Sequence, residues 1–205
     1  MTAVRFADDL GFGFSWVVEE AATRTSHALV SDGRVWLIDP VEWVPALERA
    51  KALATPAAVV QLLDRHNRDC AAIADRLAVP HVVVPDAIAS SPFDCVPVVR
   101  SRVWRETALW WPETRTLVVA EAIGANRFFR AGDEQVGVHL LLRPRPPSRL
   151  AAYRPEHLLL GHGEGVHGGA AAAALNEAIA TATTRLPRAL LRAPAFALDA
   201  VRRRR

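Results

Sequence analysis

The chain has 205 residues, 51% of them hydrophobic, and its formal net charge is +3 at pH 7. This balance is typical of a globular protein with a sizeable core and excludes an intrinsically disordered chain. No apolar run reaches the roughly 20 residues that a membrane span needs, and residues 1–9 show neither the basic nor the apolar part of a signal peptide. We therefore expect residues 1–205 to form a single domain that is not inserted in a membrane.

The first quarter of the chain predicts antiparallel strands. Residues 12–18 alternate and are rich in aromatic side chains, while residues 26–30 and 35–38 are short apolar runs. The sequence Ser31-Asp32-Gly33 between the last two runs is typical of a hairpin turn. A helix is expected next, from about residue 44 to residue 53.

The middle of the chain predicts a strand–helix–strand unit. Residues 57–63 form an apolar run that predicts a buried strand, and residues 67–77 have helical periodicity. Residues 79–84 predict a second buried strand. Units of this kind build parallel sheets, so we expect the chain to combine antiparallel and parallel pairing.

The second half predicts short strands followed by helices. Strands are expected at residues 96–99, 106–111, 117–120 and 157–160, a loop at 144–147, and helices at 170–184 and 187–201. The last segment, about 186–205, is rich in arginine and ends in the run Arg202 to Arg205. Such charges suit phosphate groups, but no aromatic or groove-reading motif accompanies them, and cations also favour the C-terminus of a helix. We therefore interpret this segment as a solvated helix end and do not expect a nucleic acid partner.

Cysteine usage indicates the compartment. Cys70 and Cys95 are the only two cysteines, which is too few for a disulfide framework. A reducing cytoplasm is therefore the expected location.

Polar residues follow three of the predicted strands at the point where each strand ends. Asp64-Arg65-His66-Asn67-Arg68-Asp69 comes directly after the strand at 57–63, and Glu121 follows the strand at 117–120. Gly161-His162-Gly163 follows the strand at 157–160. In order and placement these segments resemble the metallo-β-lactamase fold, whose strands end in Thr-His-x-His-x-Asp-His, then Gly-Asp, and last Gly-His-Gly. The resemblance implies an α/β architecture, an αββα sandwich of two mixed sheets packed face to face with helices outside.

The chain departs from the family motif at most of its metal-binding positions. The first histidine of the motif falls on Asp64, the second on His66, the aspartate on Arg68 and the last histidine on Asp69. The bridging aspartate becomes Glu121, and the mid-chain histidine has no counterpart between residues 96 and 109, where Arg105 or Glu106 stands at about its position. His66 and His162 alone remain as the family has them. The resemblance therefore implies a cleft with a degenerate site made of Asp64, His66, Arg68, Asp69, Glu121 and His162.

Two interpretations of this cleft remain open. In the first, no metal is bound, and Arg68, a permanent cation without an acceptor lone pair, replaces the charge of the second metal by pairing with Asp69 and Glu121. In the second, Asp64, His66, Glu121 and His162 hold one divalent ion such as Zn, Mn or Fe. The metal-free interpretation is the simpler, and His139, inside an apolar stretch, is expected to be packed in the core in either case.

The two interpretations imply two functions. A metal-free cleft suggests a non-catalytic protein that binds a small molecule or a protein partner, and we rank this hypothesis first. A single metal ion suggests a metal-dependent hydrolase that is lactonase- or esterase-like. Fold resemblance does not supply a function, so the arrangement of the site residues is needed to distinguish the two functions.

Overall fold

The first sheet is formed by the N-terminal part of the chain. The computed structural model describes residues 3–20 and 22–192, so that most of the predicted last helix and the run Arg202 to Arg205 lie outside the described residues. Six strands follow one another across this sheet in chain order: β1 (Ala3–Leu10), β2 (Gly13–Glu19), β3 (Arg24–Ser31), β4 (Arg34–Ile38), β5 (Thr55–Gln61) and β6 (His81–Val83). Strands β1 to β4 pair antiparallel, and β4, β5 and β6 pair parallel. The expected mixture of pairing is therefore present.

The second sheet comes from the C-terminal half. Its order is β13 (Val166–His167), β12 (His157–Leu160), β9 (Thr116–Val119), β8 (Arg105–Trp111) and β7 (Asp94–Arg100). Only the β12–β9 pair is parallel. A short ribbon of β10 (Ile123–Gly124) and β11 (Gly137–Val138) lies between β9 and β12 in the chain.

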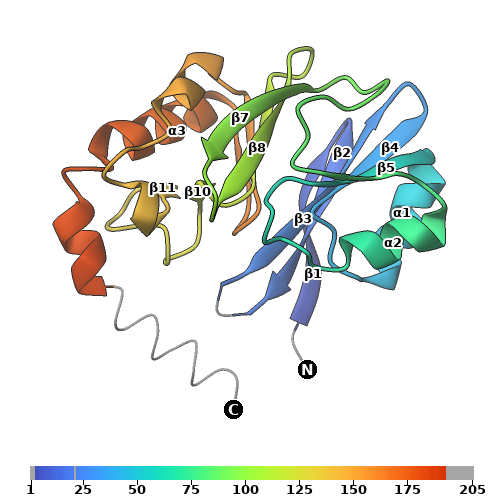
Figure 1. The fold of residues 1–205 in the computed structure, drawn as a ribbon, viewed down its shortest axis with the longest axis horizontal. Coiled ribbons are helices and arrows are strands. Elements are labelled where there is room, and N and C mark those ends of the chain that lie inside the picture. Colours follow the sequence, from blue (N-terminus) through green and yellow to red (C-terminus); the bar gives the residue numbers. More distant parts are fainter. Residues whose placement is uncertain (1–2, 21, 193–205) are drawn as a thin grey trace.

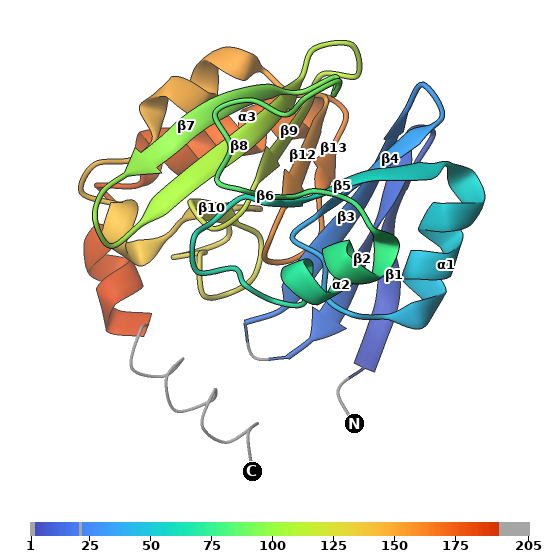
Figure 2. The same ribbon diagram turned by 45° about the vertical axis from the view of Figure 1, so that its right-hand side comes forward.

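The two sheets pack face to face, with helices on the outside. Helices α1 (Val44–Leu53) and α2 (Cys70–Leu77) cover the first sheet, and α3 (Gly169–Thr181) covers the second (Figures 1 and 2). Each interface buries its own apolar cluster, which includes Trp36, Leu62, Trp111 and Leu159 between the sheets, Leu37, Leu47 and Ile73 under α1 and α2, and Leu117, Leu158 and Leu175 under α3. The predicted αββα sandwich is confirmed.

Local sequence explains several of these elements. Asp32 and Gly33 both have positive φ angles, 48° and 69°, which is the geometry of a two-residue hairpin loop that matches the strand twist. The loop sets the register of β3 against β4, with Ser31 opposite Arg34. Helix α1 has a proline, Pro45, in its first turn, where the missing N–H costs no hydrogen bond.

Strand β1 is the main element that the sequence did not predict. Most of its side chains are exposed or half-exposed because it lies at the edge of the first sheet, so it carries little of the apolar alternation that marks a strand. Residues 186–192 are helical, as expected for the start of the last helix. Within the described ranges, no helix has both the length and the apolar character that crossing a bilayer requires.

The ends of several strands meet along one edge of the sandwich. The N–H of Thr25 in β3 donates to the carbonyl of Gly161 after β12 at 2.9 Å, and the N–H of Thr107 in β8 donates to the carbonyl of Leu62 after β5 at 2.9 Å. These hydrogen bonds join the two sheets. They bring together the segments that follow β5, β9 and β12, where the sequence places its polar residues.

Candidate metal centre

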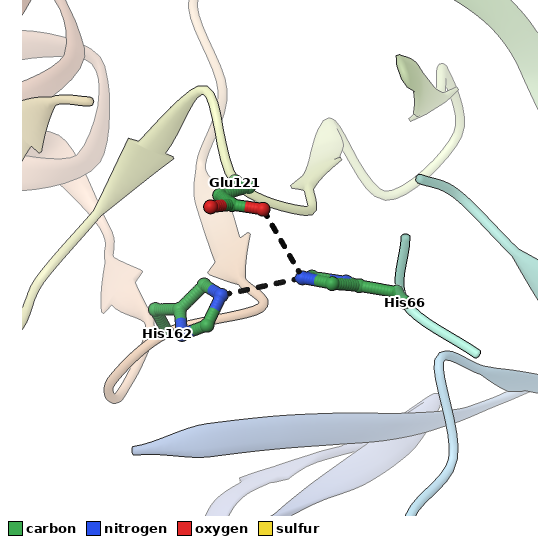
Figure 3. Close-up of side chains that lie close together, drawn as sticks. All are labelled: His66, Glu121 and His162. Atoms are coloured by element: carbon green, nitrogen blue, oxygen red, sulfur yellow. Dashed lines mark hydrogen bonds and ion pairs between the residues drawn. The ribbon is translucent and has the colours of Figure 1, made fainter. Parts of the chain in front are cut away.

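Three side chains from these segments converge on one point (Figure 3). The Nε2 atoms of His66 and His162 lie 3.3 Å apart, and Oε2 of Glu121 lies 3.6 Å from Nε2 of His66. One ligand atom from each residue lies within 4.8 Å of the other two. Donor atoms that share one metal ion at about 2.0–2.2 Å stand about 3–4 Å apart, so the spacing fits a single ion. The segments that follow β5, β9 and β12 therefore meet at one point.

The protonation of the two imidazoles follows from their outer partners. Nδ1 of His66 lies 3.0 Å from Oδ2 of Asp39, and Nδ1 of His162 lies 2.9 Å from the carbonyls of Ala22 and Thr23. Carboxylate and carbonyl oxygens only accept, so each Nδ1 carries a proton, and a ring that carries no second proton presents the lone pair of its Nε2. Two Nε2 lone pairs at this 3.3 Å separation would repel, and either a shared proton or a bound metal ion removes that repulsion.

Asp39 is the outer partner that orients His66. It follows β4, is 1% exposed and has a positive φ of 44°, and its Oδ1 accepts from the N–H of Leu62 at 3.0 Å. Burial alone would raise the pKa of Asp39, but the charge and hydrogen bond of His66, with the charge of Arg68, outweigh it and lower the pKa. An ionised carboxylate behind a histidine fixes the ring and increases the basicity of the other nitrogen. Nothing in the local sequence around Asp39 indicated this role.

His162 is held at the centre by its flanking glycines. A Cβ at Gly161 would lie 2.2 Å from the carbonyl oxygen of Ala120, and Gly163 has a φ of 100°. Glycine at both positions therefore lets the turn after β12 pass against the end of β9. Burial, together with the charges of His66 and Arg68, lowers the pKa of His162 to about 3, so that its ring is neutral near pH 7.

Glu121 is positioned by a second, buried glutamate. Oε1 of Glu106 accepts from the backbone N–H groups of Glu121 and Ala122, each at 3.0 Å, and its Oε2 accepts from the indole of Trp104 at 3.0 Å. Burial raises the pKa of Glu106 to about 7 although these three donors act in the opposite direction. The sequence placed Glu106 inside a strand, at about the position of the mid-chain histidine of the family, but it did not indicate the hydrogen bonds to Glu121 and Ala122, which are distant in the chain.

His139 also belongs to the surroundings of the centre. It is 7% exposed and contacts the rings of Trp104, Phe128 and Phe129, so the prediction of a packed histidine holds for its ring. Its Nε2, however, lies 3.5 Å from Oε1 of Glu121, which the sequence did not indicate. Burial, and secondarily the charge of Arg65, lowers the pKa of His139 to about 4.

The remaining predicted cleft residues make other contacts. Oδ2 of Asp64 accepts from the N–H of Arg105 at 3.0 Å, and Asp64 is not part of the group of three. Oδ2 of Asp69 accepts from the N–H of Glu42 at 2.8 Å. Both carboxylates therefore accept from backbone N–H groups that are distant in the chain, at the start of β8 for Asp64 and shortly before α1 for Asp69.

Arg68 departs furthest from its predicted role. Its guanidinium donates to three backbone carbonyls, of Thr25 at 2.6 Å, Asp39 at 2.7 Å and Gly161 at 3.0 Å. The metal-free interpretation required ion pairs of Arg68 with Asp69 and Glu121. Within the described part of the chain, Arg68 forms neither of them. The carbonyls at the ends of β3, β4 and β12 point at one place, and a planar donor group satisfies them together.

Arg65 lies at the mouth of the centre. Its side chain is 46% exposed, and a terminal nitrogen lies 3.7 Å from Oε2 of Glu121. The guanidinium sits over the ring of Trp104 at 4.5 Å and donates to the carbonyl of Val103 at 2.9 Å. A fixed positive charge therefore borders the group of three.

These two sheets and their strand-end centre define the metallo-β-lactamase fold. The chain is similar to the crystal structure of the DIM-1 metallo-β-lactamase exposed to ceftazidime, with 11% identity and a TM-score of 0.58 over 89% of this chain and 99% of that one. It is also similar to a metallo-β-lactamase from Pontibacter korlensis, with 11% identity and a TM-score of 0.60 over 87% of this chain and 99% of that one. Neither a sequence-family model nor a curated protein sequence matches the chain.

The residues present fit one metal ion. Two imidazole nitrogens and one carboxylate oxygen form a ligand set that zinc and non-haem iron both accept, with coordination positions left open. The close approach of the two Nε2 atoms, with Oε2 of Glu121 beside them, supplies the observation that favours a metal ion. The chain therefore has a candidate metal-binding group of His66, Glu121 and His162.

Proposed function

We propose that this protein binds one divalent metal ion through His66, Glu121 and His162 and hydrolyses a small ester or lactone there. The observation that carries the proposal is the convergence of two Nε2 atoms 3.3 Å apart with Oε2 of Glu121, 3.6 Å from Nε2 of His66, while each Nδ1 bonds to an acceptor outside the centre. A cation between them removes their repulsion and satisfies both nitrogens at once. Arg68, on which the metal-free interpretation depended, bonds to backbone carbonyls instead.

The protein's own groups supply orientation and charge. A divalent ion in such a site acts as a Lewis acid that polarises a carbonyl oxygen. Asp39 keeps the ring of His66 in place, and Glu106 holds the backbone N–H of Glu121. Arg65, half-exposed beside Glu121, is placed to stabilise negative charge that develops on a substrate oxygen.

Metal content and hydrolysis test the proposal together. Elemental analysis of protein purified without added metal is expected to give about one ion per chain. His162→Ala is expected to lose the ion and to lose hydrolysis of an aryl ester or a lactone. His81→Ala is the matched control, because His81 is an exposed histidine whose ring contacts Gln61. A chain that binds no zinc, iron or manganese, or a His162→Ala variant as active as the control, would contradict the proposal.

A second candidate function is non-catalytic binding of a small molecule or a protein partner at the same place. The low exposure of His66 and His162, 8% and 9%, favours it, because little of the centre is open to a substrate. One ion per chain without hydrolysis of esters or lactones would support this second function over the first.

A further inference from the structure

The two carboxylate oxygens of Glu121 face different histidines. Oε2 lies 3.6 Å from Nε2 of His66, on the side of the proposed ion, while Oε1 lies 3.5 Å from Nε2 of His139. His139 is therefore the neighbour of Glu121 to which the proposed function assigns no role. Because His139 lies next to a proposed ligand, the ring nitrogen that carries its proton determines whether it can donate to Glu121.

The proton of the His139 ring can be placed from its backbone contact. His139 precedes the short 3-10 helix Leu140–Leu142, and its Nδ1 accepts from the N–H of Leu141 at 3.3 Å. An N–H group only donates, so Nδ1 has no proton and the neutral ring carries its proton on Nε2. This is the reverse of His66 and His162, whose Nδ1 atoms are the protonated ones.

Packing holds the ring of His139 in this orientation. Its centroid lies 4.8 Å from that of Trp104 and 5.7 Å from that of Phe129, both edge to face. The backbone N–H of His139 donates to the carbonyl of Ala122 at 3.0 Å, one residue beyond Glu121. Ring and backbone are therefore both tied to the segment that carries the ligand.

We propose that His139 is a positioning residue that donates its Nε2 proton to Oε1 of Glu121 and leaves Oε2 as the only oxygen of Glu121 that binds the ion. The ion itself rests on the proposed function above. Since a ligand carboxylate that accepts an outer hydrogen bond is held in one orientation, His139 sets the geometry of Glu121 without touching the ion. Together with Glu106 at the backbone, it fixes Glu121 at both ends.

The first test needs no metal. Long-range nitrogen–proton NMR spectra of the full chain with ¹⁵N-labelled histidine, recorded with a chelator, distinguish the two tautomers of each ring. His139 is expected as the tautomer protonated on Nε2, with its signals assigned by their loss in His139→Gln. A His139 ring protonated on Nδ1 would overturn the proposal.

The second test compares zinc affinity in two variants with the wild type. His139→Phe keeps an aromatic ring against Trp104 and Phe129 but has no donor, and it is expected to bind zinc about 10- to 100-fold more weakly. His139→Gln places an amide N–H near the former Nε2 and is expected to recover most of that loss. Thermal unfolding of the metal-free variants shows whether each still folds.

The outcomes separate the two proposals. Wild-type affinity in His139→Phe would overturn the role of His139 alone. An equal loss in His139→Gln and His139→Phe would make His139 a ligand itself and also overturn it. No zinc binding by the wild type would overturn the proposed function, while the tautomer of His139 would still be decided by the NMR spectra. If His139→Phe does not fold, the tautomer of the wild-type His139 ring and the zinc affinity of His139→Gln test the proposal instead.

Discussion

Replacing Arg68 with methionine is expected to destabilise the fold strongly. Methionine keeps an unbranched apolar stem but removes the guanidinium, whose hydrogen bonds reach the carbonyls of Thr25, Asp39 and Gly161. Thr25 lies in β3 and Asp39 directly follows β4 of the first sheet, while Gly161 follows β12 of the second. The substitution therefore breaks a link between the sheets as well as three hydrogen bonds.

The magnitude follows from the number of carbonyls left without a donor. A hydrogen bond to a charged group contributes about 1.5–3 kcal/mol, and water entering a partly buried site recovers some of that loss. Three such bonds contribute about 4.5–9 kcal/mol together, and after the recovery by water a net loss of about 3–5 kcal/mol is expected. For a chain of this size each kcal/mol shifts Tm by about 2–4 °C, so Tm is expected to fall on the order of 10 °C.

Thermal and urea unfolding followed by far-ultraviolet circular dichroism measure this loss. Arg149→Met is the matched control, because Arg149 is exposed and the same change there removes no buried contact. Arg68→Lys, with a charge but no planar fork, is expected to fall between the two. Equal, small changes in Tm for Arg68→Met and Arg149→Met would refute the reasoning.

Two further predictions concern acid stability and substrate range. Burial lowers the pKa of the His27 ring to about 4, so between about pH 6.5 and 4 the unfolded chain binds a proton that the folded chain does not, and acid favours unfolding in that window. His27→Leu should make Tm fall less steeply with decreasing pH over this range, and an unchanged slope would contradict the prediction. Glu106, whose raised pKa acts in the opposite direction, is present in both proteins, so its contribution is common to them. Zinc-dependent hydrolysis of β-lactams is expected to stay at background, because among the residues that the structure describes the group of three holds two imidazoles. Nitrocefin hydrolysis that EDTA removes and zinc restores would show otherwise.

Local sequence determined the elements and their order. Helix α1 and strand β12 have the bounds that their apolar patterns predict, 44–53 and 157–160, because periodicity is a property of neighbouring residues. The order of polar segments after three strands predicted that His66 and His162 would meet. The ends of these strands lie at one edge of the sandwich whichever side chains the rest of the chain carries. This part of the site could therefore be predicted from the sequence.

Tertiary structure alone decided which groups surround that pair. Asp39, Glu106 and His139 lie 27, 15 and 18 residues from the ligands they contact, His66 for the first and Glu121 for the other two, and each looks ordinary in its own segment. Arg68 appeared to be a partner for carboxylates, yet its acceptors are backbone carbonyls, which every residue carries and no sequence pattern marks. The donor that each acceptor of the site meets depends on how the two sheets, formed by distant parts of the chain, pack together. That packing is a property of the whole chain.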